Sequence, residues 1–284
     1  MKFRILSTVI LASFLVLFGC SDTNDNNSTT GRLSVQLTDA PFLYDLVKEA
    51  NVTIFKIEAR YRGDVELDST TTKENSFIVL MEEEIQVNLL ELTNGVTENL
   101  VNKDVPVGTY DLIRVYVKGV NVILNDDTAY DLKVPSGEQS GIKVFVKPGI
   151  VVSGGLTADL LLDFDVSKSF IAKGGRNNLS GFNFKPVIKA SNLSTAGSLT
   201  GTVTTLVEEV QVALEGAQVS VIVADTINTT TFTDASGNYL MMGLQKGTYG
   251  IDVALEGYKS VSVESVEIEV GNKTVKDFEL VIEE

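Results

Sequence analysis

The sequence has no histidine and no tryptophan, and its only cysteine is Cys20. The absence of imidazole excludes Ser-His-Asp and Cys-His catalysis, and any zinc site that needs histidine or a set of thiolates. Carboxylate pairs, tyrosine, lysine and all-oxygen calcium sites remain. One cysteine also excludes an internal disulfide. We therefore predict a protein that is not an enzyme, with no catalytic residues and no resident metal or cofactor.

Basic residues are also scarce, since 23 Lys and Arg stand against 38 Asp and Glu, giving a formal net charge of −15 at pH 7. Nucleic acids are bound through clustered basic residues, and the sequence shows no such cluster. We therefore expect no nucleic-acid partner. The 284 residues, 44% of them hydrophobic, are enough for about two domains with cores of their own.

The first twenty residues have the composition of a secretory signal. A basic start is followed by an apolar run from Ile5 to Phe18. This run is shorter than the roughly 20 residues of a membrane span and fits the apolar region of a signal peptide. The ending Leu-Phe-Gly-Cys at 17–20 resembles the bacterial lipobox, although Phe18 is bulkier than that motif usually allows. The resemblance implies cleavage after Gly19 and acylation of Cys20. A plain signal peptide followed by a buried cysteine is the alternative.

The residues after Cys20 are polar up to residue 30 and predict a flexible tether. Acyl chains contribute about 0.8 kcal/mol per buried CH₂, so two or three of them anchor a protein stably. We expect a lipid-anchored protein of the bacterial cell envelope, in the outer membrane and exposed at the cell surface. Its predicted layout is a signal peptide at 1–19, a lipidated tether at 20–30, modules at 31–190 and 199–284, and a linker at 191–198.

From Leu33 onward, apolar residues alternate with polar ones, which is the period of a β-strand. Strands with one apolar face are typical of antiparallel sandwiches. Clear alternation begins at Leu33, Ile113, Val219, Ile251 and Val266, and helical patterns are limited to single turns near 42–49 and 87–92. We predict an all-β protein made of two tandem antiparallel β-sandwich modules.

A Gly-Thr-Tyr triplet precedes a strand in each module, at 108–110 and at 247–249. Glycine can supply a positive φ that closes a turn, and tyrosine begins the next strand with an amphipathic ring. We infer two sandwiches of related design, with chance similarity of two turns as the alternative.

The C-terminal module carries turn motifs in a recognisable order, including Thr-Asp-Ala-Ser-Gly-Asn-Tyr at 233–239 and Gly-Tyr at 257–258. There Asp234 would cap a turn and Gly237 would take the left-handed conformation. Over Ser198–Val281 the chain resembles the carboxypeptidase regulatory-like domain, a seven-stranded transthyretin-type sandwich. The resemblance implies an accessory module for spacing, adhesion or carbohydrate binding, and not the peptidase.

The N-terminal module has ordered segments of its own, at 37–41, 134–143, 162–169 and 184–188. Over Gly31–Ala190 they resemble an uncharacterised lipoprotein family, the domain of unknown function 4382. The resemblance implies a surface lipoprotein and supplies no activity. The missing tryptophan is a departure, since such domains often carry one.

The charged residues of this module suggest a ligand-binding site. Asp163 and Asp165 point to the same side of a predicted strand. If that strand pairs with the strand at 142–146, the aspartates would face Lys143 or Lys147 across the ladder. The simplest interpretation is a solvated face with ion pairs, each contributing about 0–1 kcal/mol.

Two other interpretations assign chemistry to the aspartates. Asp163 and Asp165 could bind Ca²⁺ with Asn125, Asp126 and Asp127, although no Asp-x-Asp-x-Asp-Gly loop is present. Their spacing would also suit the carboxylate pair of a retaining glycosidase, about 5–5.5 Å apart.

The loop at 135–141 suggests a sugar site instead. It would present hydroxyl and amide groups beside Lys143, from Ser136, Gln139 and Ser140. Sugar sites usually add an aromatic platform, for which Phe145 or Tyr130 is nearest in sequence.

We expect a non-catalytic binding or scaffold protein, with the membrane as one partner and a polysaccharide or surface protein as another. A carbohydrate-binding lipoprotein for nutrient capture or adhesion is the first alternative. A carboxylate-dependent, glycan-active enzyme is the second.

Overall fold

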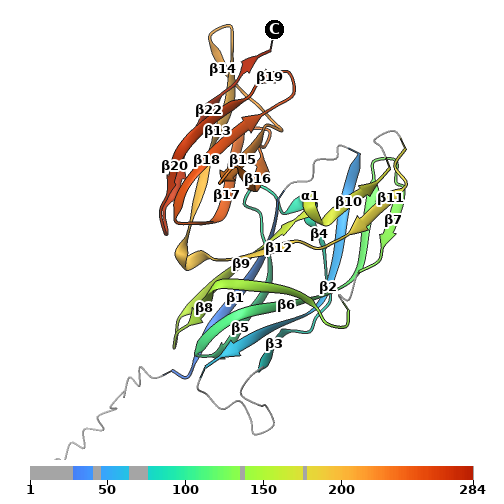
Figure 1. Ribbon diagram of the computed structural model, residues 1–284, viewed down its shortest axis with the longest axis vertical. Helices are drawn as coiled ribbons and strands as arrows, with labels where there is room; N and C mark the ends of the chain where they lie inside the picture. The colour runs from blue at the N-terminus through green and yellow to red at the C-terminus, as the bar shows by residue number, and fades with distance from the viewer. Residues whose placement is uncertain (1–27, 41–45, 64–75, 135–137, 175–177, 284) are drawn as a thin grey trace, which may run out of the picture.

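The computed structural model describes residues 28–40, 46–63, 76–134, 138–174 and 178–283. They form two β-modules, joined near residues 192–196 and stacked one above the other in Figure 1. The all-β prediction is confirmed. Gly19, Cys20 and Ser136 lie outside the described residues. Within the described ranges, no helix has both the length and the apolar character that a membrane span requires.

The N-terminal module is a sandwich of two facing sheets. Its elements are β1 (Thr30–Ala40), β2 (Val47–Arg62), β3 (Phe77–Met81), β4 (Ile85–Asn88), η1 (Leu89–Glu91), β5 (Glu98–Pro106), β6 (Gly108–Leu124), β7 (Ala129–Leu132), β8 (Ile142–Val152), β9 (Thr157–Asp165), α1 (Val166–Ser169), β10 (Phe170–Lys173), β11 (Gly181–Phe184) and β12 (Ile188–Asn192). One sheet has the order β12-β9-β1-β5. The other has the order β3-β2-β6-β7, with β4 also on β2 and β8 also on β6, while β10 and β11 form a separate pair.

Strand alternation decides which side chains fill the space between these sheets. Leu33, Val35 and Leu37 of β1 are fully or almost fully buried, and so are Ile113 and Val115 of β6. Removing such side chains from water contributes roughly 25 cal/mol per Å² of apolar surface. The predicted alternation in β1 and β6 is therefore confirmed.

The sheet of β1 is mixed, although the pattern predicted antiparallel pairing only. β1 runs antiparallel to β5 and parallel to β9. Parallel neighbours need a long crossover connection. Here the chain between β1 and β9 builds the whole facing sheet, so no hairpin constrains the direction of β9.

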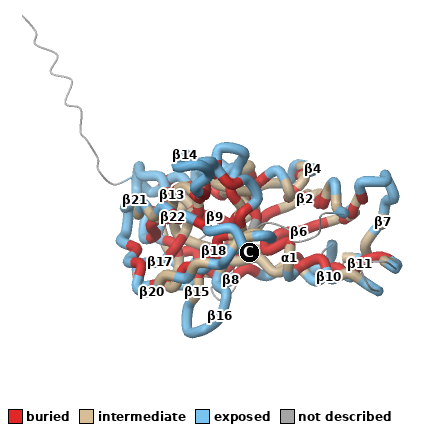
Figure 2. Tube along the Cα trace, turned by 90° about the horizontal axis from the view of Figure 1, so that it is seen from above, coloured by how far each residue is buried: buried red, intermediate tan, exposed pale blue. Residues whose placement is uncertain are grey.

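The C-terminal module is a second sandwich. Its elements are β13 (Ala196–Val207), β14 (Val210–Ala213), β15 (Gln218–Val223), β16 (Thr226–Phe232), β17 (Asn238–Gln245), β18 (Gly247–Ala254), β19 (Tyr258–Lys259), β20 (Val261–Ile268), β21 (Lys273–Val275), β22 (Phe278–Glu279) and β23 (Val281–Ile282). One sheet contains β14-β13-β17 with β21 and β22 on β13, the other has the order β16-β15-β18-β20, and β19 pairs with β23. Figure 2 shows the buried positions inside the sandwich and the exposed edge strand β14.

Both Gly-Thr-Tyr triplets anchor a tyrosine in the same way. The Tyr110 hydroxyl donates to the Pro106 carbonyl at 2.8 Å, and the Tyr249 hydroxyl donates to the Gln245 carbonyl at 2.7 Å. In each module the acceptor lies four residues before the ring. The glycines differ, because Gly108 has a φ of 155° whereas Gly247 is not among the residues of positive φ. The predicted positive φ therefore holds at the first triplet and is wrong at the second.

The predicted Asp234 turn is confirmed. The Asp234 carboxylate accepts hydrogen bonds from the backbone N–H groups of Ser236 and Asn238, both at 2.9 Å. These bonds hold the pKa of Asp234 below its usual value. Gly237 has a φ of 75°, a conformation that glycine adopts without strain, and Tyr239 then enters β17 fully buried.

Changing Tyr110→Phe or Tyr249→Phe should lower the free energy of unfolding by about 1–3 kcal/mol, because each change leaves a carbonyl without its buried donor. Urea unfolding of residues 21–284 measures the change. Tyr130→Phe is the matched control, since that ring packs edge-to-face on Phe182. Equal stability of all three variants would show that the two tyrosine bonds contribute nothing net.

Candidate functional site

The structure separates the predicted site residues into two places. Gln139 and Ser140 lie in the turn before β8, and Lys143 lies on β8, in the sheet of β2 and β6. Asp163 and Asp165 lie on β9, in the facing sheet. β8 pairs with β6, placing Lys143 opposite Arg114, whereas β9 pairs with β1 and β12. The two candidate strands therefore do not pair, and the aspartates do not face Lys143 or Lys147 across a ladder, because the chain passes from one sheet to the other between them.

Asp163 lies at the junction of the two modules. Lys189 of β12 is opposite Asp163 in the ladder, and its Nζ donates to the Asn228 carbonyl of the C-terminal module. Thr229 of β16 donates a side-chain hydrogen bond to the Asp163 carboxylate. Burial raises the pKa of Asp163 to about 6 against the attraction of Lys189, and burial also lowers the pKa of Lys189. The predicted solvated face is thus a contact between modules.

Asp165 has a structural role. Its carboxylate accepts the backbone N–H of Lys168 at 3.0 Å, which caps α1, and the Ser167 hydroxyl at 2.7 Å. The Lys168 ammonium lies 2.7 Å from its other oxygen. Although burial opposes it, these bonds lower the pKa of Asp165. The carboxylate is therefore occupied by local donors, which does not fit a nucleophile.

The calcium interpretation does not fit the geometry either. Asp126 accepts the backbone N–H of Thr128 in the turn between β6 and β7, and Asp127 pairs with Lys48 at 2.8 Å. Over the described ranges, no three acidic side chains gather in a group that could hold a metal ion.

A second polar surface covers the outside of the sheet of β8, β6, β2 and β3, and we name it the outer face. Its central side chains are Lys143 and Phe145 of β8, Asp111, Arg114 and Tyr116 of β6, Lys56, Glu58 and Arg60 of β2, and Phe77 of β3. The ladder aligns Lys143, Arg114 and Glu58 in one row. Core residues such as Val144, Ile113 and Ala59 alternate with them, so this row points away from the core.

Arg114 is packed between other side chains of the outer face. Its guanidinium lies 3.7 Å from the centre of the Phe77 ring, and its Nη1 lies 3.8 Å from Glu58 Oε2. The Tyr116 hydroxyl donates to the same Glu58 oxygen at 2.7 Å. Arg114 Nε is buried and makes no hydrogen bond within the part of the chain that the structure describes. Although burial opposes it, hydrogen bonds from Lys56 and Tyr116 lower the pKa of Glu58.

The polar loop before β8 ends against this face. Gly141, with a φ of 67°, lies so close that a Cβ on it would be 3.2 Å from Arg114 and from the Tyr116 ring. Of the two aromatic residues nominated from the sequence, Phe145 lies here and exposes 55% of its surface. Tyr130 packs against Phe182 instead. Sequence reasoning missed Arg114, Tyr116 and Phe77, since only strand register brings them together.

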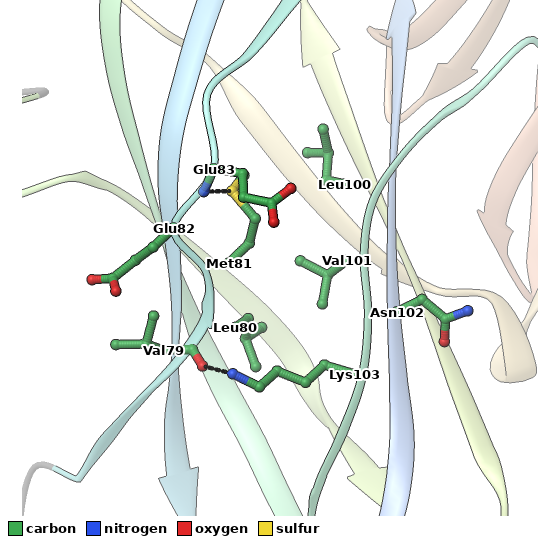
Figure 3. Close-up of a pocket in the computed structure, with 9 residues that line it drawn as sticks. All are labelled: Val79, Leu80, Met81, Glu82, Glu83, Leu100, Val101, Asn102 and Lys103. Carbon is green, nitrogen blue, oxygen red and sulfur yellow. Dashed lines mark hydrogen bonds between the residues drawn. The ribbon is translucent and has the colours of Figure 1, made fainter.

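A hollow of about 510 Å³ lies between the edges of the two sheets, at β3 and β5 (Figure 3). Leu80, Leu100 and Val101 line it, and the Lys103 ammonium donates to the Val79 carbonyl at 2.8 Å. Glu82 points away from it in Figure 3. Its lining therefore does not present the facing carboxylates of a glycosidase.

Comparison with known sequences identifies the class of this two-module protein. The family described as "Domain of unknown function (DUF4382)" matches residues 30–186, more than half of the chain, and the chain belongs to this family. Residues 198–281 match the carboxypeptidase regulatory-like domain. Both resemblances inferred from the sequence are confirmed. Neither family carries a catalytic assignment, and no curated protein matches the chain.

Several solved structures are distantly similar. A minor pilin of Streptococcus agalactiae is 11% identical over 88% of this chain and 96% of that chain, with a TM-score of 0.27. The shaft pilin SpaA of Lactobacillus rhamnosus GG is 10% identical over 90% and 99%, with a TM-score of 0.27. A cohesin–X-dockerin complex of Acetivibrio cellulolyticus is 13% identical over 30% of this chain and 58% of that chain, with a TM-score of 0.25. Scores this low support no argument about function.

The two aspartates should affect stability in opposite ways as the pH changes. The pKa of Asp163 in the folded protein is about 6, above the reference value of 3.8. Its contribution to the free energy of unfolding is therefore fully present below pH 3.8 and is lost as the pH rises through about 6. The pKa of Asp165 is lowered in the folded protein. Its contribution to the free energy of unfolding is therefore present above pH 3.8 and is lost as the pH falls through the folded-state pKa.

At pH 7 we therefore expect Asp163→Asn to be at least as stable as the parent chain, and Asp165→Asn to lose about 1–3 kcal/mol. Urea unfolding at several pH values measures both, with Lys189 and Lys168 left in place. If Asp163→Asn is less stable than the parent chain at pH 7, the attraction between Asp163 and Lys189 outweighs the cost of burying the Asp163 charge. The raised pKa assigned to Asp163 would then be wrong.

Proposed function

We propose that this protein is a non-catalytic, lipid-anchored component of the bacterial cell envelope. Its two modules act as one stiff arm, and the N-terminal module, which follows the tether, carries the outer face. The observation that carries the proposal is the junction, where side chains and backbone of one module bond directly to the other. An arm of fixed geometry suits a scaffold or binding protein.

The connection between the modules is short and ordered. Ser191 and Asn192 end β12, Leu193–Thr195 form η2, and β13 begins at Ala196. The Asn192 side chain caps η2 by accepting the backbone N–H of Ser194 at 3.0 Å. The segment expected to be a polar linker is thus secondary structure over its whole length.

Side chains reinforce the junction. Asn94, in the turn before β5, accepts the backbone N–H of Leu240 at 2.6 Å and donates to the Asn238 carbonyl at 3.3 Å. The Gln245 amide donates to the Lys147 carbonyl at 3.3 Å. Together with the Asp163–Thr229 contact, these bonds connect three places on the N-terminal module to the C-terminal one.

One further observation supports a protein without catalytic activity, and another supports a lipid anchor. The carboxylates examined above are engaged by lysine, arginine or backbone donors, and the sequence supplies no histidine as a general base. The apolar run from Ile5 to Phe18 is followed by Gly19 and Cys20, an order that resembles the lipobox apart from the bulky Phe18.

Changing Cys20→Ser should abolish incorporation of labelled palmitate, because no acyl chain can then be attached. Expression in a Gram-negative host with alkyne-tagged palmitate, followed by immunoprecipitation and detection of the label, measures the change. Ser21→Ala, which leaves the cysteine in place, should be labelled like the parent chain. Labelling of the Cys20→Ser protein, or absence of labelling of the parent chain, would contradict the lipid anchor.

The stiff junction predicts a single narrow distance between the modules. Residues 21–284 contain no cysteine, so spin labels can be placed at Asn102→Cys and Lys259→Cys without background. We expect one narrow distance distribution by pulsed electron paramagnetic resonance, and a broader one after Asn94→Ala. Asn183→Ala, which removes an exposed amide elsewhere, is the control. A broad distribution in the parent chain would overturn the stiff arm.

A further inference from the structure

The outer face carries an excess of positive charge on a protein whose net charge is −15. Its basic side chains are Lys56, Arg60, Arg62, Arg114, Lys118, Lys143 and Lys147. Its acidic ones are Glu49, Glu58, Glu82, Glu84 and Asp111. A local reversal of sign attracts an anionic partner.

The acids of this face already have partners, and Glu49 accepts a hydrogen bond from the Asn51 amide. Asp111 binds Arg60 at 2.7 Å and Arg62 at 3.0 Å, Glu58 and Glu82 both pair with Lys56, and Glu84 pairs with Lys118. Lys143 and Lys147 are exposed on β8, and neither forms an ion pair with another described residue. The charge that is free to meet a ligand is therefore concentrated on β8.

Phe145 stands between these two lysines. It exposes 55% of its surface, and the Lys147 ammonium lies 5.9 Å from the centre of its ring. The side chains at 143, 145 and 147 share one side of the strand, opposite the buried Val144 and Val146. An exposed ring flanked by two free cations combines a stacking surface with two charge contacts.

We propose that the outer face binds an anionic polysaccharide, with carboxylate or sulfate groups on Lys143 and Lys147 and a sugar ring stacked on Phe145. The proposal rests on the binding role proposed above and names its ligand class. The apolar C–H face of a sugar packs on an aromatic ring, while its anionic substituents reach the flanking ammonium groups. Gln139, exposed at the end of the adjoining loop, offers an amide for sugar hydroxyls.

The spacing of the cations favours a polysaccharide over a nucleic acid. Lys143 and Lys147 are four residues apart on one strand, which places them roughly 13 Å apart. In duplex DNA each strand carries one phosphate per about 3.4 Å of helix axis. Glu58 and Asp111 neutralise the neighbouring basic side chains of β2 and β6, so the two free lysines are not part of a continuous basic track that such a backbone could follow. A sugar chain can instead place single anionic groups on the two lysines with a ring on Phe145 between them.

Binding of residues 21–284 to polygalacturonate, dextran sulfate and neutral dextran tests the proposal, measured by isothermal titration calorimetry at two salt concentrations. We expect saturable binding to polygalacturonate or dextran sulfate that weakens with salt, and none to neutral dextran. Which of the two polymers binds tells carboxylate from sulfate as the recognised group.

The Lys143→Gln/Lys147→Gln chain should bind about tenfold more weakly, the loss expected for two exposed charge contacts. Phe145→Ala should weaken binding at both salt concentrations.

The matched control is Lys259→Gln/Lys273→Gln, which removes the same charge from exposed positions on the C-terminal module and should bind like the parent chain. Absence of binding to both anionic polymers, or equal weakening by the two double variants, would overturn the proposal. So would tighter binding to single-stranded DNA than to either polymer. Membrane fractionation of the Lys143→Gln/Lys147→Gln protein should be unchanged, so failure of the anchor and failure of the ligand assignment remain distinguishable.

Discussion

The ladder between β2 and β6 is the interaction on which the rest of the N-terminal module depends. It runs from Val47 opposite Leu124 to Arg62 opposite Thr109, with four irregularities in register. Each irregularity changes which residue faces the core, and bulges of this kind increase the twist of a sheet. One side of the ladder fills the core, while the other side builds the outer face. The same backbone bonds therefore hold the fold and position Arg114, Glu58 and Arg60.

The junction has a different physical basis. It combines apolar contacts, such as Leu240 against Gly95 and Leu161 against Gly243, with groups that are costly to leave unpaired, such as Asp163, Lys189 and the Asn94 amide. Polar groups at such a contact impose geometry, because each donor must meet its acceptor. This gives the two modules a defined arrangement.

Much of the fold could be predicted from the sequence, because alternation in β1 and β6 and the turn chemistry at Asp234 are local properties. The partners of Lys143 and Asp163 could not, because they depend on which sheet each strand joins. Leu160 and Leu162 showed which side of β9 meets the core, but nothing in the sequence showed that the other side meets a second module. Arg114 and Phe77 are likewise brought together by register across three strands. The alternation of Arg114 and Tyr116 with buried residues was the available signal, and it indicates a face without indicating its neighbours.

The outer face of the two-module arm is the proposed binding surface for anionic polysaccharide. Amide chemical-shift mapping of residues 21–284, titrated in turn with short oligosaccharides of galacturonic acid and with sulfated dextran oligosaccharides, locates that surface. We expect at least one of the two ligands to give shifts concentrated at Lys143–Lys147 and at neighbouring positions on β6 and β2, with little change in the C-terminal module. Shifts confined to the C-terminal module or to the hollow between β3 and β5, or no shifts with either ligand, would contradict this assignment.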